Sequence, residues 1–202
     1  MKKDSPKPRG RPRNFDRNTA LDRAVITFWT KGYNGASLDD LTESMGISRP
    51  SLYATYGNKH DLFMQVIDRY AETLGCKPVE AFFGEPHIVE AVAAFFDMSI
   101  RCVTAEDGPK GCLIATVATE EAQEDVEVRD KLSVMFADFE NAFVDRFQAA
   151  QDHGQLPQNA DPRALASMTI SISHSFAARG RVGATPEELS GMAKSYMAVM
   201  WP

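Results

Sequence analysis

The sequence is poor in cysteine and has no long apolar run, and each shortage excludes a class of protein. Its three cysteines, Cys76, Cys102 and Cys112, are widely spaced and form no CxxC pair, so they give no disulfide framework. No apolar stretch is long enough to span a membrane, and the basic start lacks the apolar segment of a signal peptide. We therefore expect a cytoplasmic protein that makes no membrane contact.

Motifs of enzyme chemistry are also missing. The sequence has no nucleophile elbow, no glycine loop that would hold a phosphate and no metal-spaced cluster of histidine and glutamate. The acidic stretch EEAQEDVE at 120–127 adds neither histidines nor a rigid geometry, which favours a solvated helix junction over a metal site. We expect no enzyme activity, no metal and no cofactor.

Positive charge is scarce overall but concentrated at one end. The net charge is −6, which taken alone argues against a nucleic-acid partner. Residues 1–59, however, carry 11 Lys and Arg against 6 Asp and Glu, and the remaining residues carry 11 against 22. A basic head on an acidic body predicts a polyanionic partner at the head only.

Helical periodicity runs through almost the whole chain, and no segment is a convincing strand. Glycine and proline divide the pattern, and capping residues begin several of its segments. The fold class we expect is all-α, with a flexible basic tail at 1–14, a helix-turn-helix domain at 15–60 and a helical bundle at 61–202. The pattern predicts about nine helices, at 16–31, 37–45, 48–57, 58–75, 86–104 and 126–153, with others beginning near 111, 161 and 185.

Residues 37–57 have the pattern of a helix-turn-helix. Ser37-x-x-Asp40 matches a capping box, and Gly46 permits the tight turn between two short helices. The second helix would present its N-terminal residues Ser48, Arg49, Pro50 and Ser51 to the major groove, where arginine suits guanine. Tyr53 and Tyr56, three residues apart, would reach phosphates, as would Lys59 in the first turn of the next helix. The alternative is that both tyrosines are half-buried core residues and that Ser48 is only a cap.

The sequence from Ala20 to Phe63 closely resembles the DNA-binding domain of the tetracycline-repressor (TetR) family. The shared features are FxxKGY at 28–33, a serine and Asp-Leu at 37–41, GIS at 46–48, SLYxxYxxK at 51–59 and LF at 62–63. The resemblance implies an all-helical homodimer that binds operator DNA through this domain and usually holds a small effector in its C-terminal domain. It also implies that Ser37, Ser48, Arg49, Pro50, Ser51, Tyr53, Tyr56 and Lys59 lie where the family touches DNA.

The basic tail carries a second possible DNA contact, KPRGRPR at 7–13. Arg9 and Arg11 would lie in a narrow A·T-rich minor groove, because proline keeps the arm extended and glycine allows close approach. The alternative is a basic leader that adds only non-specific phosphate attraction. Under both readings, removing residues 1–13 weakens DNA binding and flattens its salt dependence. Only minor-groove reading predicts a greater loss on A·T-flanked operators, which gel shifts on matched A·T- and G·C-flanked duplexes would measure.

The C-terminal body offers candidates for an effector site, although a helical bundle needs the same apolar residues simply for its core. The candidates are Phe95, Met98, Cys102, Cys112, Thr116, Phe139 and Phe143. Cys102 and Cys112 flank the loop EDGPKG and are either a thiol switch or buried and inert. The helix containing His174 is rich in small residues, so we place it and the last helix at a two-fold interface, where His174 faces its symmetry mate or lines the core.

The function that fits these features is that of a ligand-responsive transcriptional regulator, expected to repress. A homodimer would bind a palindromic double-stranded operator with two recognition helices about one DNA turn apart. An unknown small-molecule effector would tilt the fourth helix and shift the population to a state that no longer fits. The alternatives are an architectural or constitutive DNA-binding protein without an effector and, as a distant third, an all-helical enzyme.

Overall fold

The computed structural model describes residues 15–201, and in that range it contains helices and no strand. The predicted all-α fold class is thus confirmed. Arg9 and Arg11 lie outside the described residues. The helices are α1 (Arg17–Gly35), α2 (Leu38–Met45), α3 (Arg49–Tyr56), α4 (Lys59–Tyr70), the π-helix η1 (Ala71–Gly75), α5 (Cys76–Gly84), α6 (Ile88–Val103), the π-helix η2 (Ile114–Ala118), α7 (Thr119–Glu121), α8 (Val126–Asp152), α9 (Pro162–Arg181) and α10 (Pro186–Met200).

The first four helices form one end of the molecule, and their starts follow the predicted caps. Ser37, Ser48 and Asn58 each accept a hydrogen bond from the third backbone N–H of the helix that follows. Such caps satisfy N–H groups that a short helix leaves unpaired, which matters most for α2 and α3 at eight residues each. Phe28 and Phe63 pack with ring centroids 5.0 Å apart in the core beneath them.

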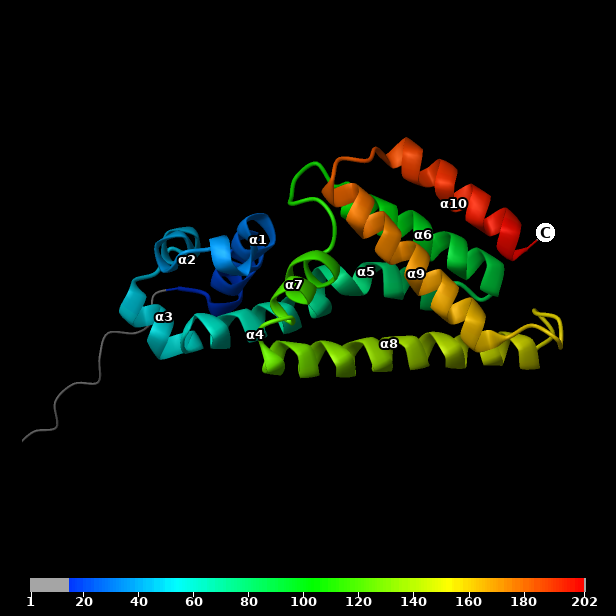
Figure 1. Ribbon diagram of the computed structural model, residues 1–202, viewed down its shortest axis with the longest axis horizontal. Coiled ribbons are helices and arrows are strands. Elements are labelled where there is room, and N and C mark those ends of the chain that lie inside the picture. Colours follow the sequence, from blue (N-terminus) through cyan, green and yellow to red (C-terminus); the bar gives the residue numbers. More distant parts are fainter. Residues whose placement is uncertain (1–14, 202) are drawn as a thin grey trace, which may run out of the picture.

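One continuous rod of helix leads from this end into the body. Gly75 and Pro78 were expected to end the fourth helix, and that expectation is wrong. Gly75 keeps a right-handed helical φ of −69°, and the chain passes from α4 through η1 into α5 without a break. The widened π-turn ends three residues before Pro78, which lacks the N–H that an α-helix would use there. The rod therefore belongs to both halves of the molecule (Figure 1).

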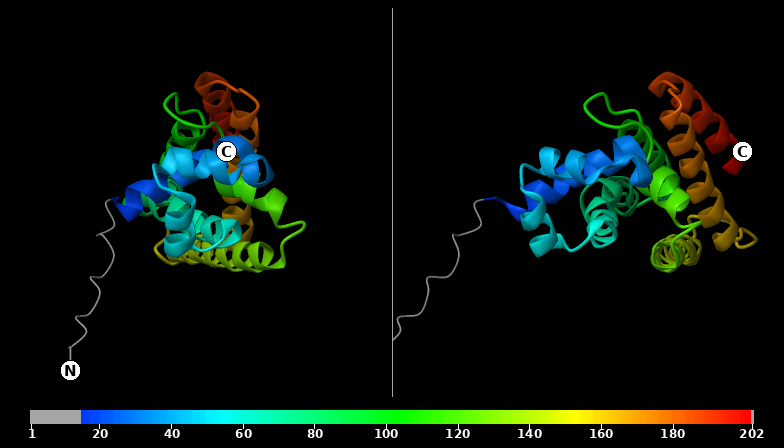
Figure 2. Two further views of the ribbon diagram at one scale, coloured as in Figure 1. Left: turned by 90° about the vertical axis from the view of Figure 1, so that its left-hand side faces the viewer. Right: turned by 60° about the vertical axis from the view of Figure 1, so that its left-hand side comes forward.

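The body is a bundle in which α6 packs against α5, α9 and α10, while α8 packs against α9. Its core is aromatic: the rings of Phe82 and Phe143 stack at 4.1 Å, and Phe96 meets Phe176 edge-on at 5.5 Å. Gly180 lets α9 approach α6 closely, because a Cβ at this position would lie 2.8 Å from the carbonyl oxygen of Val103. In the right-hand view of Figure 2, as in Figure 1, α9 and α10 lie at the end of the molecule away from α3.

Several contacts hold the two halves together. The Arg181 guanidinium, at the end of α9, donates to the carbonyl oxygen of Trp29 in α1 at 2.9 Å. His60 at the start of α4 lies 2.9 Å from Asp125, the residue that caps α8. Apolar residues of η2 and α8 also join the core formed by α1–α4, and that core extends along α4 to Tyr70. The domain boundary expected at residue 60 therefore falls inside α4.

Candidate DNA-contacting face and effector cavity

The turn between α2 and α3 has the geometry expected of a helix-turn-helix. Gly46 adopts a left-handed conformation, with φ 67° and ψ 34°, which glycine reaches without the steric cost of a Cβ. The next N–H, that of Ile47, closes the turn by donating to the carbonyl of Thr42 at 3.0 Å. The side chain of Ile47 packs against the core formed by α1–α4, as an apolar residue that fills the turn would. These contacts fix the start of α3 relative to α2.

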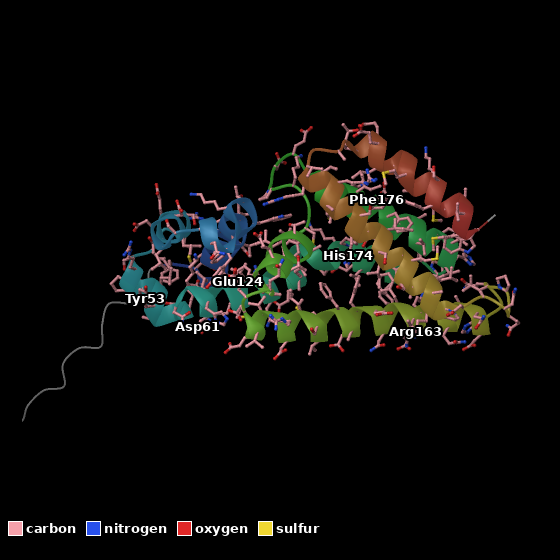
Figure 3. The ribbon with its side chains drawn as sticks, viewed as in Figure 1. Tyr53, Asp61, Glu124, Arg163, His174 and Phe176 are labelled. Atoms are coloured by element: carbon pink, nitrogen blue, oxygen red, sulfur yellow. The ribbon has the colours of Figure 1, made fainter. Side chains whose placement is uncertain are left out.

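The outer face of α3 stands at the end of the molecule opposite α10 (Figure 1). Ser48, Arg49, Pro50 and Tyr53 are exposed there, and Tyr53 has 49% of its surface free (Figure 3). The hydroxyls of Ser48 and Ser51 lie 3.0 Å apart and form a hydrogen bond. Either hydroxyl can turn outward only if this bond breaks. The face thus combines a cation, hydroxyls and a phenol on a short helix whose outer side is left exposed by residues 15–201.

Arg49 is not free on this face, because α2 supplies a carboxylate partner. Its Nε donates to Oδ1 of Asp39 at 3.1 Å, and its Nη2 donates to the same oxygen at 2.7 Å. Both side chains remain more than half exposed. Asp39 is not among the DNA-contacting residues predicted from the sequence, and no local spacing rule indicates it, since the two residues lie on different helices.

Tyr56 differs from the prediction. It is only 2% exposed, and its hydroxyl donates to the backbone carbonyl of Arg17 at 2.7 Å. Burial also raises the pKa of its phenol. The expectation that Tyr56 reaches a phosphate is therefore wrong for this structure, because its one hydroxyl proton is used inside the protein. The signal was present in the sequence: Tyr56 follows the buried Leu52 by four residues and so shares its inward face.

The two tyrosines should separate stability from DNA binding when each is replaced by phenylalanine. Tyr56→Phe removes a buried hydrogen bond and leaves the Arg17 carbonyl unpaired, so unfolding free energy should fall by about 1–2 kcal/mol. Tyr53→Phe should leave the unfolding free energy within about 0.5 kcal/mol but weaken operator binding. Urea titration and fluorescence anisotropy measure the two effects. Equal effects of both variants on both properties would contradict this assignment.

Lys59 and Ser37, which flank the helix pair, both have partners within the protein. The Lys59 ammonium lies 4.6 Å from the centre of the Tyr33 ring, and burial lowers its pKa. Ser37 completes a capping box with Asp40, whose carboxylate also pairs with Lys31. The hydrogen bond from Lys31, followed by those from Ser37, lowers the pKa of Asp40 to about 2. A cation over an aromatic ring gives Lys59 a stabilising role besides any phosphate contact.

A large cavity opens in the body, about 470 Å³ in volume, between the rod and helices α6, α8 and α9. Its wall is mostly apolar and aromatic, and its polar groups are few: Ser99, Asp138, Ser173 and His174, together with the Tyr70 hydroxyl. This is the composition and size range of a small-molecule site. Both π-helices contribute to the wall, through residues of Ala71–Gly75 and through Ile114 and Ala115.

Four of the seven predicted ligand-binding candidates line this cavity: Phe95, Cys102, Cys112 and Phe139. The other three are outside its wall. Phe143 is fully buried in the stack with Phe82, Met98 is half-buried elsewhere on α6, and the Thr116 hydroxyl donates to the backbone carbonyl of Cys112. The sequence did not single out Ser99, Asp138 or Ser173 for this site.

All three cysteines of the chain line the cavity, and all are free thiols. Cys102 and Cys112 are half-buried, which is intermediate between the two states considered from the sequence. Burial raises the pKa of the Cys102 and Cys76 thiols, so both are protonated at neutral pH. Among residues 15–201 no cluster of histidine, cysteine and carboxylate side chains is arranged to hold a metal ion.

His174 lies on the cavity wall rather than in the core. Its ring centre is 5.9 Å from that of Phe136, and part of its surface remains exposed. The surrounding protein nevertheless excludes enough water to lower its pKa, so the ring is neutral at pH 7. A neutral imidazole offers one donor and one acceptor to a bound molecule. In the described part of the chain, no helix is long and apolar enough to cross a membrane.

Both halves of the chain match family profiles. Residues 20–66 match the profile of bacterial regulatory proteins of the tetR family, and residues 89–196 match a tetracyclin repressor-like C-terminal domain. The second profile includes the parts of α6, η2, α8 and α9 that line the cavity but not the rod, and the first includes α2, α3 and most of α4.

Similar proteins of known name are transcriptional regulators. The HTH-type transcriptional repressor ComR of Escherichia coli is 34% identical over 97% of this chain and 93% of its own. The uncharacterized regulator YezE of Bacillus subtilis is 33% identical over 78% of this chain and 81% of its own. The TetR family regulator CifR, solved as a cysteine mutant with 26-bp double-strand operator DNA, superposes with a TM-score of 0.88 at 33% identity, covering 96% of this chain and all of that one.

Proposed function

Because the chain belongs to the TetR family of transcriptional regulators, we propose that it is a ligand-responsive repressor that acts in the cytoplasm as a homodimer on a palindromic operator. Family membership sets the class, DNA-binding regulator rather than enzyme. The proposal adds the sign of regulation, the dimer and release by a small molecule in the cavity.

The observation that carries the proposal is the shared wall between the cavity and the rod that leads to α3. Tyr70 ends α4, and Ala71, Leu74 and Gly75 of η1 follow it on the same wall. At its other end, α4 packs in one core with α3 through Leu62 and Leu52. A molecule that enters the cavity thus touches the same continuous helix that supports the DNA-contacting face.

The cavity also favours the proposed sensor over a constitutive DNA-binding protein. A constitutive protein has no need of an open site in its body, whereas this one has about 470 Å³ with polar groups on an apolar wall. The lining predicts an effector that is mainly apolar, with one or two groups that hydrogen-bond to Ser99, Ser173 or His174. Its size is limited to that of an ordinary small metabolite or drug-like molecule.

The dimer is proposed to form through α9 and α10. Half of the exposed residues on α9 are small, among them Ser167, Ser171 and Ala178, and α10 exposes Ala198 and Val199. Such faces allow close approach between copies of a helix. Two copies joined at this end would hold their two α3 helices apart at the other end, as two half-sites on one face of a duplex require.

The direct test is to ask which DNA the protein retains from its own genome, and then to measure binding to that duplex by gel shift. Retention of a palindromic sequence, with two chains per duplex by light scattering, is the expected result. Small apolar compounds suggested by the neighbouring genes are then titrated into the complex, and a reporter gene gives the sign of regulation. Failure to retard any duplex at low salt, or a strictly monomeric protein, would contradict the proposal.

A further inference from the structure

We propose that Asp39 is a specificity-determining positioning residue, which orients the Arg49 guanidinium for reading a base. This inference rests on the proposed function of α3 as the DNA-contacting helix. Asp39 belongs to the first turn of α2, and Arg49 is the first residue of α3. The contact between them thus links the two helices of the motif at the side chain that is best suited to guanine.

The geometry of the pair leaves one edge of the guanidinium free. Nε and Nη2 each donate to Oδ1 of Asp39, at 3.1 and 2.7 Å. Arginine has five N–H donors in a rigid plane, so three remain after this contact. Two of them point in parallel along the Nη1–Nη2 edge, which is the spacing that the O6 and N7 acceptors of guanine match. Asp39 therefore occupies the Nε–Nη2 edge of the guanidinium and leaves the Nη1–Nη2 edge available.

A purely stabilising role does not account for Asp39. The pair is largely exposed, with 53% of the Arg49 side chain and 78% of the Asp39 side chain accessible, and exposed ion pairs contribute little to folding. The start of α2 is already capped by Ser37 and carries a second acidic residue, Asp40, in its first turn. A carboxylate beside a DNA-contacting face also repels phosphates, which costs affinity on every sequence.

What Asp39 supplies instead is order in a long, flexible side chain. A free arginine must lose rotamer freedom when it binds a base, and it can also turn to any nearby phosphate. When Asp39 holds it, the guanidinium has a fixed plane and a fixed direction of its free edge before DNA binds. The positioning role therefore predicts that removing Asp39 changes affinity and discrimination in opposite directions.

The experiment compares five variants with the wild type on duplexes selected by the wild-type protein from a random-sequence pool. Single base-pair changes through the half-site of the selected duplex, and one unrelated duplex, complete the set. Asp39→Ala removes the carboxylate, and Asp39→Asn keeps an acceptor without charge. Glu43→Ala removes an exposed carboxylate from the same helix and serves as the matched control. Arg49→Ala, alone and combined with Asp39→Ala, closes a double-mutant cycle.

Asp39→Ala should bind the unrelated duplex more tightly than the wild type, because a negative charge is gone. Its discrimination against a changed guanine should fall about tenfold, at the same base pair where Arg49→Ala loses discrimination. The discrimination of Asp39→Asn should fall between those of the wild type and Asp39→Ala. Glu43→Ala should gain affinity for the unrelated duplex without losing discrimination. In the Arg49→Ala background, Asp39→Ala should have no further effect on discrimination.

Two results overturn the positioning role alone. One is wild-type discrimination in Asp39→Ala, and the other is a loss of discrimination that persists in the absence of Arg49. A wild-type protein that selects no sequence from the pool would instead contradict the proposed function, and the positioning role would fall with it. Far-ultraviolet circular dichroism of each variant distinguishes these outcomes from simple unfolding of α2.

Discussion

Replacing Phe143 by alanine should lower the free energy of unfolding by about 3–5 kcal/mol. The side chain is fully buried, its ring lies parallel to that of Phe82 at 4.1 Å, and the Phe95 ring meets it edge-on at 5.0 Å. Removing it leaves a cavity between α5, α6 and α8 that rigid helices cannot close. Urea or thermal unfolding followed by circular dichroism measures the loss, and a value below about 1.5 kcal/mol would contradict the core role.

Phe83 provides a matched control for this change. It is the neighbour of Phe82 on α5, and its ring also contacts Phe143 edge-on at 6.0 Å, but 45% of its surface is exposed. Phe83→Ala should therefore destabilise the protein much less than Phe143→Ala. Equal losses would show that the cost comes from aromatic contacts in general rather than from burial.

Replacing Gly180 by alanine should also destabilise the fold, by about 1–3 kcal/mol. Its new Cβ would lie 2.8 Å from the backbone oxygen of Val103 and 3.1 Å from the Val103 side chain. A backbone atom cannot move aside as a flexible side chain can, so α9 would have to shift away from α6. Chemical denaturation reports the change, and stability equal to that of the wild type would contradict the close approach.

Replacing Gly191 by alanine should change the free energy of unfolding in the opposite direction. It is exposed on α10, and a Cβ there would meet no atom within 4 Å. Alanine has a higher helix propensity than glycine, so Gly191→Ala should stabilise the protein by up to about 1 kcal/mol. Both glycine variants are compared at one protein concentration, because association between chains also affects apparent stability.

The starts of the helices could be predicted from the sequence because caps are local. Ser37, Ser48, Asn58 and Thr185 each bond to a backbone N–H of the following turn, as their sequence positions indicate. Such a bond depends on the identity of the capping residue and not on the rest of the fold. The capping box of α2 and the left-handed Gly46 of the helix-turn-helix are local in the same sense.

The features that the sequence did not predict depend on contacts between distant residues. Gly75 and Pro78 usually stop a helix, but packing against two cores keeps the rod continuous through a π-turn. Tyr56 was assigned to the DNA face, although the carbonyl of Arg17, 39 residues away, takes its hydroxyl proton. The Asp39–Arg49 pair likewise requires two helices to be placed first.

The cavity shows the same division between local and distant information. Aromatic and cysteine residues at helical spacing suggested Phe95, Cys102, Cys112 and Phe139, which do line it. The same spacing suggested Phe143, which fills the neighbouring core instead. Periodicity gives the inward face of a helix, but only the packing of all the surrounding helices decides where that face leaves a space unfilled.

The π-turn between α4 and α5 sets the rotation about the helix axis that relates the buried face of α4 to that of α5. At 3.6 residues per turn, the residue about three full turns after Tyr70 is Ala81, yet it is Phe82 that is fully buried. The one additional residue in Ala71–Gly75 absorbs this offset of about 100°. If the turn tightened to an ordinary α-helix, α4 would rotate about its own axis relative to the Phe82 stack, and α3 would be carried round with it. A single residue thus fixes the rotational setting of the DNA-contacting face.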